Sequence, residues 1–135
     1  MKIFIDTNIL ISTTVWPNSV PAKAFAKASS LPNIGMICQQ NIDEMMNTFF
    51  DKFRTRFHLL NSFLTDTLPA LVFVPIPPEL HVSESHMRDV KDRPILRAAI
   101  FAGADILLTG DKDFLESGIT SPRIMNASEF LALEQ

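Results

Sequence analysis

Four carboxylates, Asp6, Glu44, Asp92 and Asp111, occupy positions from which they could act together. Asp6 directly follows the first apolar run that we predict to be a strand, and Asp111 comes shortly after the fourth. Glu44 lies in the first turn of the helix predicted after the second strand, and Asp92 opens the helix that leads to the fourth. In an open sheet of parallel strands, ligands bind at the carboxyl ends of the strands. We therefore expect the four acids to meet at one edge of the sheet.

Such a cluster of acids is suited to metal-assisted chemistry on phosphate. Clustered carboxylates repel one another and raise one another's pKa values, so the cluster is stable only when a cation offsets its charge. Oxygen ligands favour the hard ions Mg²⁺ and Mn²⁺, and Mg²⁺ commonly shares its shell with substrate phosphate. One ion can activate a water molecule, and a second ion about 3.5–4 Å away can stabilise the leaving oxygen. The acids therefore predict a site that binds phosphate through one or two divalent ions.

The elements that would position these acids alternate along the chain. Apolar runs predict strands at residues 2–5, 34–38, 71–74 and 106–108, with a weaker fifth at 123–125. Apolar residues three and four positions apart predict helices, after a short Ala-rich one at 22–28, at residues 42–53, 59–68, 95–102 and 127–133. Asn41 and Asn126 are the expected N-terminal caps of two of them, and Gly103 is an expected C-terminal cap. This alternation predicts a parallel sheet covered by helices on both faces, in a single domain of residues 1–135.

The composition limits the classes of protein to which the chain can belong. With 47% hydrophobic and 20% charged residues, it has enough apolar material for a core and too little charge for disorder. No apolar run approaches the roughly 20 residues of a membrane helix. The first run ends too early for a signal peptide, and the single Cys38 cannot form an internal disulfide, so we expect a cytoplasmic protein. The net charge of −3 means that any nucleic acid would be held by a local basic patch or through metal ions.

Each acid also has an ordinary structural role open to it. An aspartate after a strand often forms a turn or caps a helix. An acid in the first turn of a helix often only complements the helix dipole. The argument for chemistry therefore depends on the convergence of all four acids on one edge of the sheet.

The segments that carry the acids resemble the motifs of the PIN-domain family. Residues 3–10, IFIDTNIL, are similar to the first motif, and residues 41–45, NIDEM, match the second through Glu44. Residues 92–99, DRPILRAA, and residues 103–114, GADILLTGDKDF, resemble the paired third and fourth motifs. The resemblance spans residues 2 to about 133. Its most specific part is TGDKD after a strand, with an Asp-led helix before it.

This resemblance implies both a fold and an activity. It implies a three-layer α/β/α sandwich with a mainly parallel five-stranded sheet in the order 3-2-1-4-5, which puts Asp6 and Asp111 on adjacent strands. It also implies an endoribonuclease that depends on Mg²⁺ or Mn²⁺ and hydrolyses RNA phosphodiester bonds. Many small members are VapC-type toxins of bacterial toxin–antitoxin systems. The partners implied are therefore an RNA substrate, an antitoxin protein and a second copy in a homodimer, with no membrane.

Carried over by position, the resemblance makes Asp6, Glu44, Asp92 and Asp111 the metal ligands. Asp6, Asp92 and Asp111 would hold the principal ion, while Glu44 would complete that site or hold a second ion. Asp113 is either a fifth ligand or the cap of the short helix that follows it.

Several neighbouring residues are candidates for supporting roles. Asn8 is expected to orient Asp6, and Thr109 either orients Asp111 or is an ordinary hydroxyl at the end of a strand. Contacts with RNA phosphates are expected from the basic residues that flank two of the acids, with an ordinary solvated surface as the alternative: Lys91, Arg93 and Lys112.

Two other classes of function stay open. A catalytically silent PIN fold would act only as an interaction partner and would bind no metal. A nuclease or phosphatase acting on DNA or another phosphoester could use a similar sheet, but a haloacid-dehalogenase-type phosphatase would need an aspartate where Asn8 stands. The chain has no Gly-rich phosphate loop, which argues against nucleotide hydrolysis.

Overall fold

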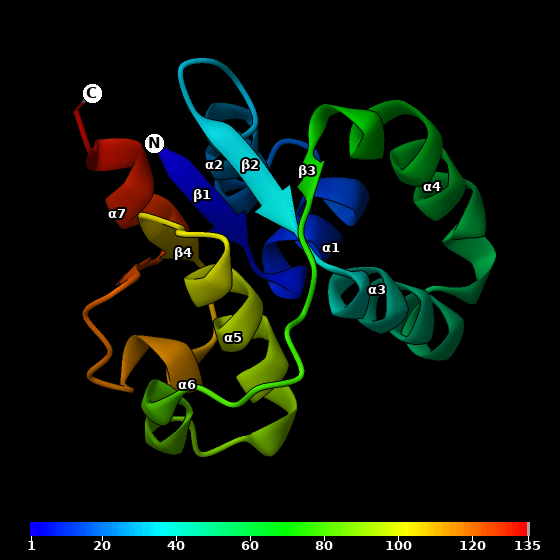
Figure 1. Cartoon of the computed structure of the whole chain (residues 1–135). Helices are drawn as coiled ribbons and strands as arrows, with labels where there is room; N and C mark the ends of the chain where they lie inside the picture. Colours follow the sequence, from blue (N-terminus) through cyan, green and yellow to red (C-terminus); the bar gives the residue numbers. More distant parts are fainter. Residues whose placement is uncertain (135) are drawn as a thin grey trace.

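Five parallel strands form one sheet in the computed structural model, which describes residues 1–134 (Figure 1). The strands are Lys2–Ile5 (β1), Ile34–Ile37 (β2), Val72–Phe73 (β3), Ile106–Leu108 (β4) and Arg123–Met125 (β5). Their order is β3-β2-β1-β4-β5, which confirms the order that the resemblance implies. Ile5 pairs with Leu108, so β1 and β4 end side by side at the carboxyl edge of the sheet.

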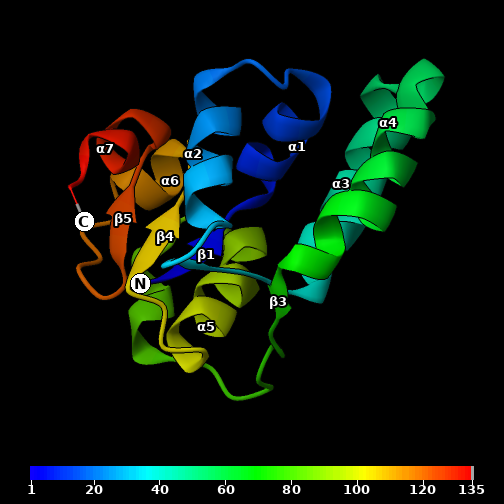
Figure 2. The same ribbon diagram turned by 90° about the horizontal axis from the view of Figure 1, so that it is seen from above.

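Helices cover both faces of this sheet. The described residues form the α-helices Thr7–Val15 (α1), Val20–Ala28 (α2), Gln39–Lys52 (α3), Phe57–Ser62 (α4), Arg93–Phe101 (α5), Lys112–Leu115 (α6) and Ala127–Ala132 (α7). Helices α1, α2 and α7 pack on one face and α5 on the other, while α3 and α4 lie side by side beyond β3 (Figure 2). The predicted three-layer α/β/α sandwich is therefore confirmed.

Alternate residues of the strands contribute to two separate cores. Ile3 and Ile5 of β1 pack with α1, α2 and α7, whereas Phe4 packs with α5. Strand β4 repeats this pattern, with only Leu107 on the α5 side. Because both faces of the sheet are buried, its inner strands have continuous apolar sequences.

Helix α1 is the main element that the sequence does not predict. Its residues are mostly β-branched, which favours strand rather than helix. It forms because Asp6 caps its first turn and because Ile9 and Leu10 are buried against the sheet. The hydroxyls of Thr13 and Thr14 donate to carbonyls four residues earlier, which satisfies these polar groups within the helix.

Helix α3 begins earlier than its apolar pattern predicts. Cys38 is its N-cap, and the expected cap, Asn41, instead occupies the third helical position and accepts a hydrogen bond from Cys38 N at 2.8 Å. Glu44 consequently lies in the second turn rather than the first. The other two expected caps are confirmed, because Gly103 follows α5 with a φ of 70° and the Asn126 side chain caps α7.

The helix expected at residues 59–68 is not regular. It is α4 followed by a π-helix, Phe63–Thr67, and a 3-10 helix, Leu68–Ala70. The third strand is also shorter than the apolar run at 71–74. Helix α3, with 14 residues, is the longest that the structure describes, and none within residues 1–134 has the length and apolarity to cross a membrane.

Candidate metal centre

A cleft of about 200 Å³ opens at the carboxyl ends of β1 and β4. Its lining includes all four predicted acids, Asp6, Glu44, Asp92 and Asp111. The other lining residues are Thr7, Asn8, Ile11 and Thr48. No basic side chain is among these lining residues, so the charges of the acids are not balanced within the cleft.

Asp6 is held rigidly by two hydrogen bonds. Its Oδ1 accepts from Thr7 N at 2.8 Å, and its Oδ2 accepts from Thr109 Oγ1 at 2.7 Å. The side chain is buried, and this burial raises the pKa of Asp6 to about 6, although both hydrogen bonds act in the opposite direction. The nearby charges of Glu44 and Asp111 raise this pKa further.

Glu44 is positioned by a chain of hydrogen bonds that begins at a buried asparagine. Thr7 Oγ1 donates to Glu44 Oε1 at 2.6 Å and accepts from Asn41 Nδ2 at 3.1 Å. Asn41 Nδ2 also donates to Ile5 O at 3.2 Å, which ties the end of β1 to the first turn of α3. Burial raises the pKa of Glu44, against the hydrogen bonds from Thr7 and Gln40.

Replacing Asn41 with alanine is expected to lower the free energy of unfolding by about 2–4 kcal/mol. The substitution removes three buried hydrogen bonds. Cys38 N, Ile5 O and Thr7 Oγ1 each lose the partner that the Asn41 side chain provides. Asn47, an exposed asparagine on the same helix, provides the matched control, since Asn47→Ala should change stability by less than about 0.5 kcal/mol. Urea denaturation followed by circular dichroism would measure both. Equal stability of the two variants would show that the Asn41 hydrogen bonds contribute nothing.

Asp92 is the acid that the protein itself stabilises least. It stands immediately before α5, but its side chain makes no capping hydrogen bond. The residue is 9% exposed, and its Oδ2 is buried with no hydrogen-bond partner among the described residues. Burial, followed by the charges of Asp111, Asp6 and Asp89, raises the pKa of Asp92 strongly.

Asp111 rather than Asp113 is the N-cap of α6. Asp111 Oδ1 accepts from Asp113 N at 2.9 Å, so the alternative in which Asp113 caps the helix is wrong. The Asp113 carboxylate instead forms an ion pair with Arg88 Nη2 at 2.7 Å and does not line the cleft. A role for Asp113 as a fifth ligand stays a prediction.

The two polar residues that were expected to support the acids act differently from the expectation. Thr109 Oγ1 donates to Asp6 Oδ2, and it contacts Asp111 only by accepting from its backbone N at 3.0 Å. Asn8 does not orient Asp6, because its Oδ1 accepts from Gly110 N at 3.3 Å. Thr109, rather than Asn8, therefore orients the carboxylate of Asp6. Asn8 instead contacts the loop that follows β4.

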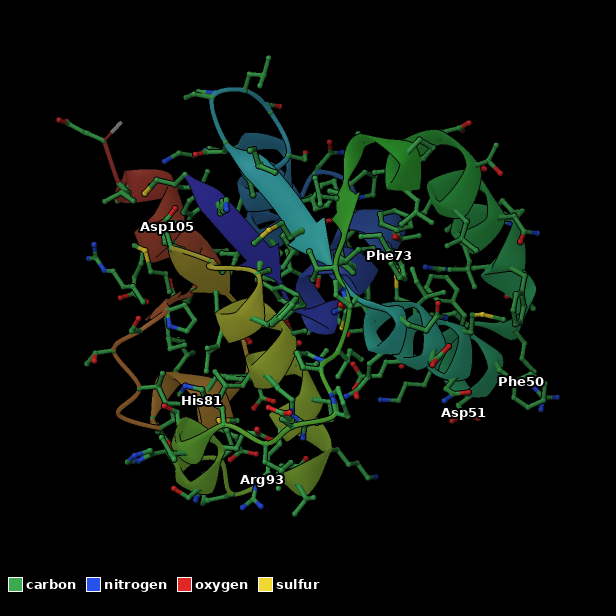
Figure 3. All side chains as sticks on the ribbon, viewed as in Figure 1. Phe50, Asp51, Phe73, His81, Arg93 and Asp105 are labelled. Atoms are coloured by element: carbon green, nitrogen blue, oxygen red, sulfur yellow. The ribbon has the colours of Figure 1, made fainter. Side chains whose placement is uncertain are left out.

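The three basic residues that are predicted to contact phosphate differ in how available their side chains are. Lys91 and Lys112 are exposed beside Asp92 and Asp111. Arg93, labelled at the start of α5 in Figure 3, uses Nε and Nη2 to donate to Met87 O at 3.2 and 3.0 Å. The two lysines are therefore better placed than Arg93 to contact a substrate.

Three of the four acids stand at the N-termini of helices. Asp6 precedes α1, Asp92 precedes α5 and Asp111 precedes α6. A helix N-terminus carries a partial positive charge of up to about half an elementary charge, which lowers the cost of a nearby carboxylate. Since the pKa values of Asp6 and Asp92 are nevertheless raised, the helix ends do not balance the site.

The residues of the cleft fit a hard divalent cation. Its donors are carboxylate, hydroxyl and amide oxygens, which Mg²⁺ and Mn²⁺ prefer over softer ligand types. A carboxylate can accept about four hydrogen bonds, so Asp6, which accepts two, keeps lone pairs for an ion. Asp92 Oδ2 is buried and has no donor within residues 1–134, as expected for an oxygen whose partner is a cation.

Sequence reasoning missed the residues that hold the acids in place. Asn41 and Glu44 lie three residues apart on one helix and therefore share a face, which is the signal that could have linked them. Thr7 was recognised only as part of a motif, and its contact with Glu44 depends on how α1 packs against α3. No pattern in the sequence indicated that Asp89 approaches Asp92 and Asp113.

Two solved structures have a fold similar to that of this chain. A chain in a structure of VapBC2 from Rickettsia felis, bound to a DNA fragment from their promoter, matches with a TM-score of 0.68 and 17% identity, over 93% of this chain and 98% of that chain. A chain of FitAB bound to an IR36 DNA fragment matches with a TM-score of 0.68 and 16% identity, over 98% of each chain. At these identities the likeness shows the fold alone.

The sequence itself shows the family. No curated protein matches the chain significantly, but the PIN domain family matches it over residues 2–113, which include all four acids of the cleft. With its sheet order and the positions of its acids, the chain belongs to the PIN domain family.

Proposed function

We propose that the chain is a divalent-metal-dependent endoribonuclease that hydrolyses RNA phosphodiester bonds and is the toxin of a toxin–antitoxin pair. The observation that supports this most strongly is the cleft in which Asp6, Glu44, Asp92 and Asp111 meet without a basic residue among its lining side chains. The buried Asp92 Oδ2, which has no hydrogen-bond partner among the described residues, supports the need for a cation there. Membership of the PIN domain family agrees with this chemistry.

The residues of the cleft would divide the work between them. When bound, Mg²⁺ or Mn²⁺ would supply charge neutralisation, phosphate binding and activation of water. Asp6, Asp92 and Asp111 would hold the principal ion, and Glu44 would complete that site or hold a second ion. The hydroxyls described above keep Asp6 and Glu44 in fixed orientations before any ion arrives.

The surroundings of the cleft and the similar proteins support the proposed substrate and partners. Lys91 and Lys112 are exposed beside the acids and would contact backbone phosphates of RNA. The VapBC2 and FitAB structures are complexes, which supports a protein partner that silences this chain, namely an antitoxin. We further propose a homodimer, which size-exclusion chromatography with light scattering would test.

Chelation of divalent ions is expected to stop cleavage of RNA. A mixed pool of single-stranded RNA would be incubated with the protein and Mg²⁺ or Mn²⁺, with and without EDTA, and the products separated by gel electrophoresis. Cleavage should fall to background in EDTA and return when excess Mn²⁺ is added, because the carboxylates alone cannot bind phosphate. Cleavage that continues in EDTA would contradict the proposal.

The matched control is Asp111→Asn, purified in parallel. Asparagine caps helices as well as aspartate, so this variant should keep α6 while losing a metal ligand. Cleavage by this variant at the wild-type rate would reveal a contaminating ribonuclease. Cleavage of single-stranded DNA without RNA would overturn the substrate class, and the absence of Mn²⁺ binding by calorimetry would favour a catalytically silent PIN fold.

A further inference from the structure

Three basic residues stand together at the outer end of the arm that α3 and α4 form beyond β3 (Figure 2). Lys52 is the last residue of α3, and the other two belong to the short 3-10 helix, Arg54–Arg56, that follows it. All three side chains are exposed, and none forms an ion pair within residues 1–134. We define Lys52, Arg54 and Arg56 as the basic tip.

The charge of the basic tip is opposite to that of the rest of the chain. Outside the tip, nine basic residues stand against fifteen acidic ones. Asp51, an exposed residue near the end of α3 (Figure 3), is the only acidic residue between Glu44 and Asp66. This end of the arm therefore attracts anions, although the net charge of the whole chain is −3.

Arg54 is stacked on an aromatic ring that is itself exposed. Its guanidinium carbon Cζ lies 4.3 Å from the centre of the Phe50 ring, and its Nε donates to Phe50 O at 2.9 Å. These contacts restrain the plane of the guanidinium, while Phe50 stays 54% exposed. Proteins bind single-stranded nucleic acids by such combinations, in which positive charge contacts phosphates and bases stack on aromatic rings or guanidinium planes. An acidic peptide would use the charge of the tip but not the stacked pair.

The basic tip also lies on the same helix as two residues of the cleft. Glu44 and Thr48 line the cleft, and Lys52 follows at the next interval of four residues, which places these three residues along one side of α3. At about 1.5 Å per residue, Lys52 lies about 12 Å beyond Glu44 along the helix axis. A strand that is cut in the cleft therefore needs only a few further nucleotides to reach the tip.

We propose that the basic tip binds the sugar–phosphate backbone of single-stranded RNA on one side of the cleavage site, and that one base stacks on the pair formed by Phe50 and Arg54. The inference rests on the proposed function, because it assigns a second contact to the same substrate. The tip supplies what the acidic cleft lacks, which is affinity for RNA before any metal ion is bound. Binding at the tip is therefore independent of metal and weakened by salt, since each phosphate contact releases counterions from the RNA.

Binding of RNA in EDTA tests this without any cleavage. A short fluorescein-labelled single-stranded RNA of mixed sequence would be titrated with the protein at several salt concentrations, with fluorescence anisotropy as the signal. The combined substitution Lys52→Gln, Arg54→Gln and Arg56→Gln should weaken binding at low salt by about tenfold or more. It should also reduce the magnitude of the slope of log affinity against log salt by about two, because three phosphate contacts are lost. Asp51→Asn should strengthen binding by about twofold, because it removes the acid beside the tip.

The matched control replaces three exposed basic residues elsewhere, Lys2, Lys23 and Arg123, with glutamine. It changes the net charge by the same amount and should alter the affinity by less than about twofold, because distant charges are screened. Equal weakening by the two triple substitutions would overturn a local site. Phe50→Leu should weaken binding by about fivefold or more and leave the salt slope unchanged, because it removes stacking and no charge. Unchanged affinity in Phe50→Leu would overturn the stacking contact.

Three further outcomes separate this inference from its alternatives. Displacement of the RNA by polyglutamate at an equal concentration of charge would overturn RNA as the ligand and indicate a surface for an acidic protein. In cleavage with Mn²⁺, the variant without the basic tip should show a raised KM and an unchanged kcat, and an unchanged KM would overturn the tip while the proposed function stands. Binding in EDTA that depends on the tip, without any cleavage in Mn²⁺, would overturn the proposed function alone.

Discussion

Replacing Asp92 with asparagine is expected to abolish RNA cleavage and, in the metal-free protein, to raise the melting temperature. Under the proposed function, activity is lost because Asp92 is a proposed ligand of the principal ion, and a metal ion supplies several kcal/mol of transition-state stabilisation. Such a loss corresponds to a rate reduced by about a thousandfold or more. The gain in stability follows from the surroundings of the same side chain.

Asp92 is destabilising in the absence of metal because it is buried among like charges. Its Oδ2 has no donor in the described chain, and Asp111, Asp6 and Asp89 all oppose its ionisation. Asparagine has nearly the same shape, carries no charge and offers an N–H group to the neighbouring carboxylates. Because the Asp92 side chain does not cap α5, the substitution removes no capping hydrogen bond. We expect a gain of about 1–2 kcal/mol, or roughly 3–8 °C in melting temperature.

Differential scanning calorimetry in EDTA and in excess Mn²⁺ would measure the melting temperatures of the wild type and of Asp92→Asn without and with metal. In EDTA, Asp92→Asn should melt higher than the wild type. In Mn²⁺, the wild type should gain more than the variant, because only the wild type keeps all of the proposed ligands. Asp51→Asn serves as the control for the loss of one negative charge and should alter neither difference. A variant that melts lower than the wild type in EDTA would contradict this account of Asp92.

The metal-free protein is also expected to lose stability as the pH rises from about 5 to about 8. The folded-state pKa of Asp6 is raised from 3.8 to about 6, so the folded state binds a proton more tightly than the unfolded chain does. Such a group favours folding at low pH, and that contribution is lost as the pH rises to the raised value and beyond. A shift of this size corresponds to about 3 kcal/mol, and Asp92 adds a change of the same sign at higher pH.

Measurements above pH 5 separate this loss of stability from the contribution of acidic groups whose pKa is lowered in the folded protein. The ion pair with Arg97 lowers the pKa of Glu84, so its contribution is complete above the usual value of 4.5 and is lost only as the pH falls below it. Urea denaturation at several pH values, with constant ionic strength and EDTA, would measure the slope. Asp6→Asn should flatten the slope and Asp51→Asn should not. Saturating Mn²⁺ should reverse its sign, because the ion binds the ionised acids. Stability that rises with pH in EDTA would show that the acids of the cleft ionise without penalty.

The sheet and the four acids were predictable because they depend on short-range features of the sequence. Each inner strand is a short apolar run, and Asp6 and Asp111 come just after two of these runs. The start of the helix that contains Glu44 was predicted too late, because its apolar face begins at Ile42 while its first turn is polar. The order of the strands came from the resemblance to the family, since the runs alone do not determine which strands are neighbours.

The hydrogen-bond partners within the site could not be predicted because they depend on tertiary packing. Thr109 donates to Asp6 rather than to the carboxylate of Asp111, which is only two residues away in the chain, because β1 and β4 are adjacent. Asn41 has the usual features of a cap, yet its amide reaches back to β1 because α3 starts three residues earlier than Asn41. The closeness of Asp89 to Asp92 and Asp113 was likewise not predictable, because it depends on the turn in which Asp89 Oδ1 accepts from Lys91 N.

The position of three acids at the starts of helices has an evolutionary consequence. Asp6 and Asp111 cap α1 and α6, and asparagine caps helices equally well. The codons for aspartate and asparagine differ by a single base, so one point mutation can remove the charge and keep the helix start. A descendant of this chain could therefore lose catalysis and keep its shape and its binding surfaces. The architecture of the proposed nuclease is in this way one mutational step from that of a protein that only binds.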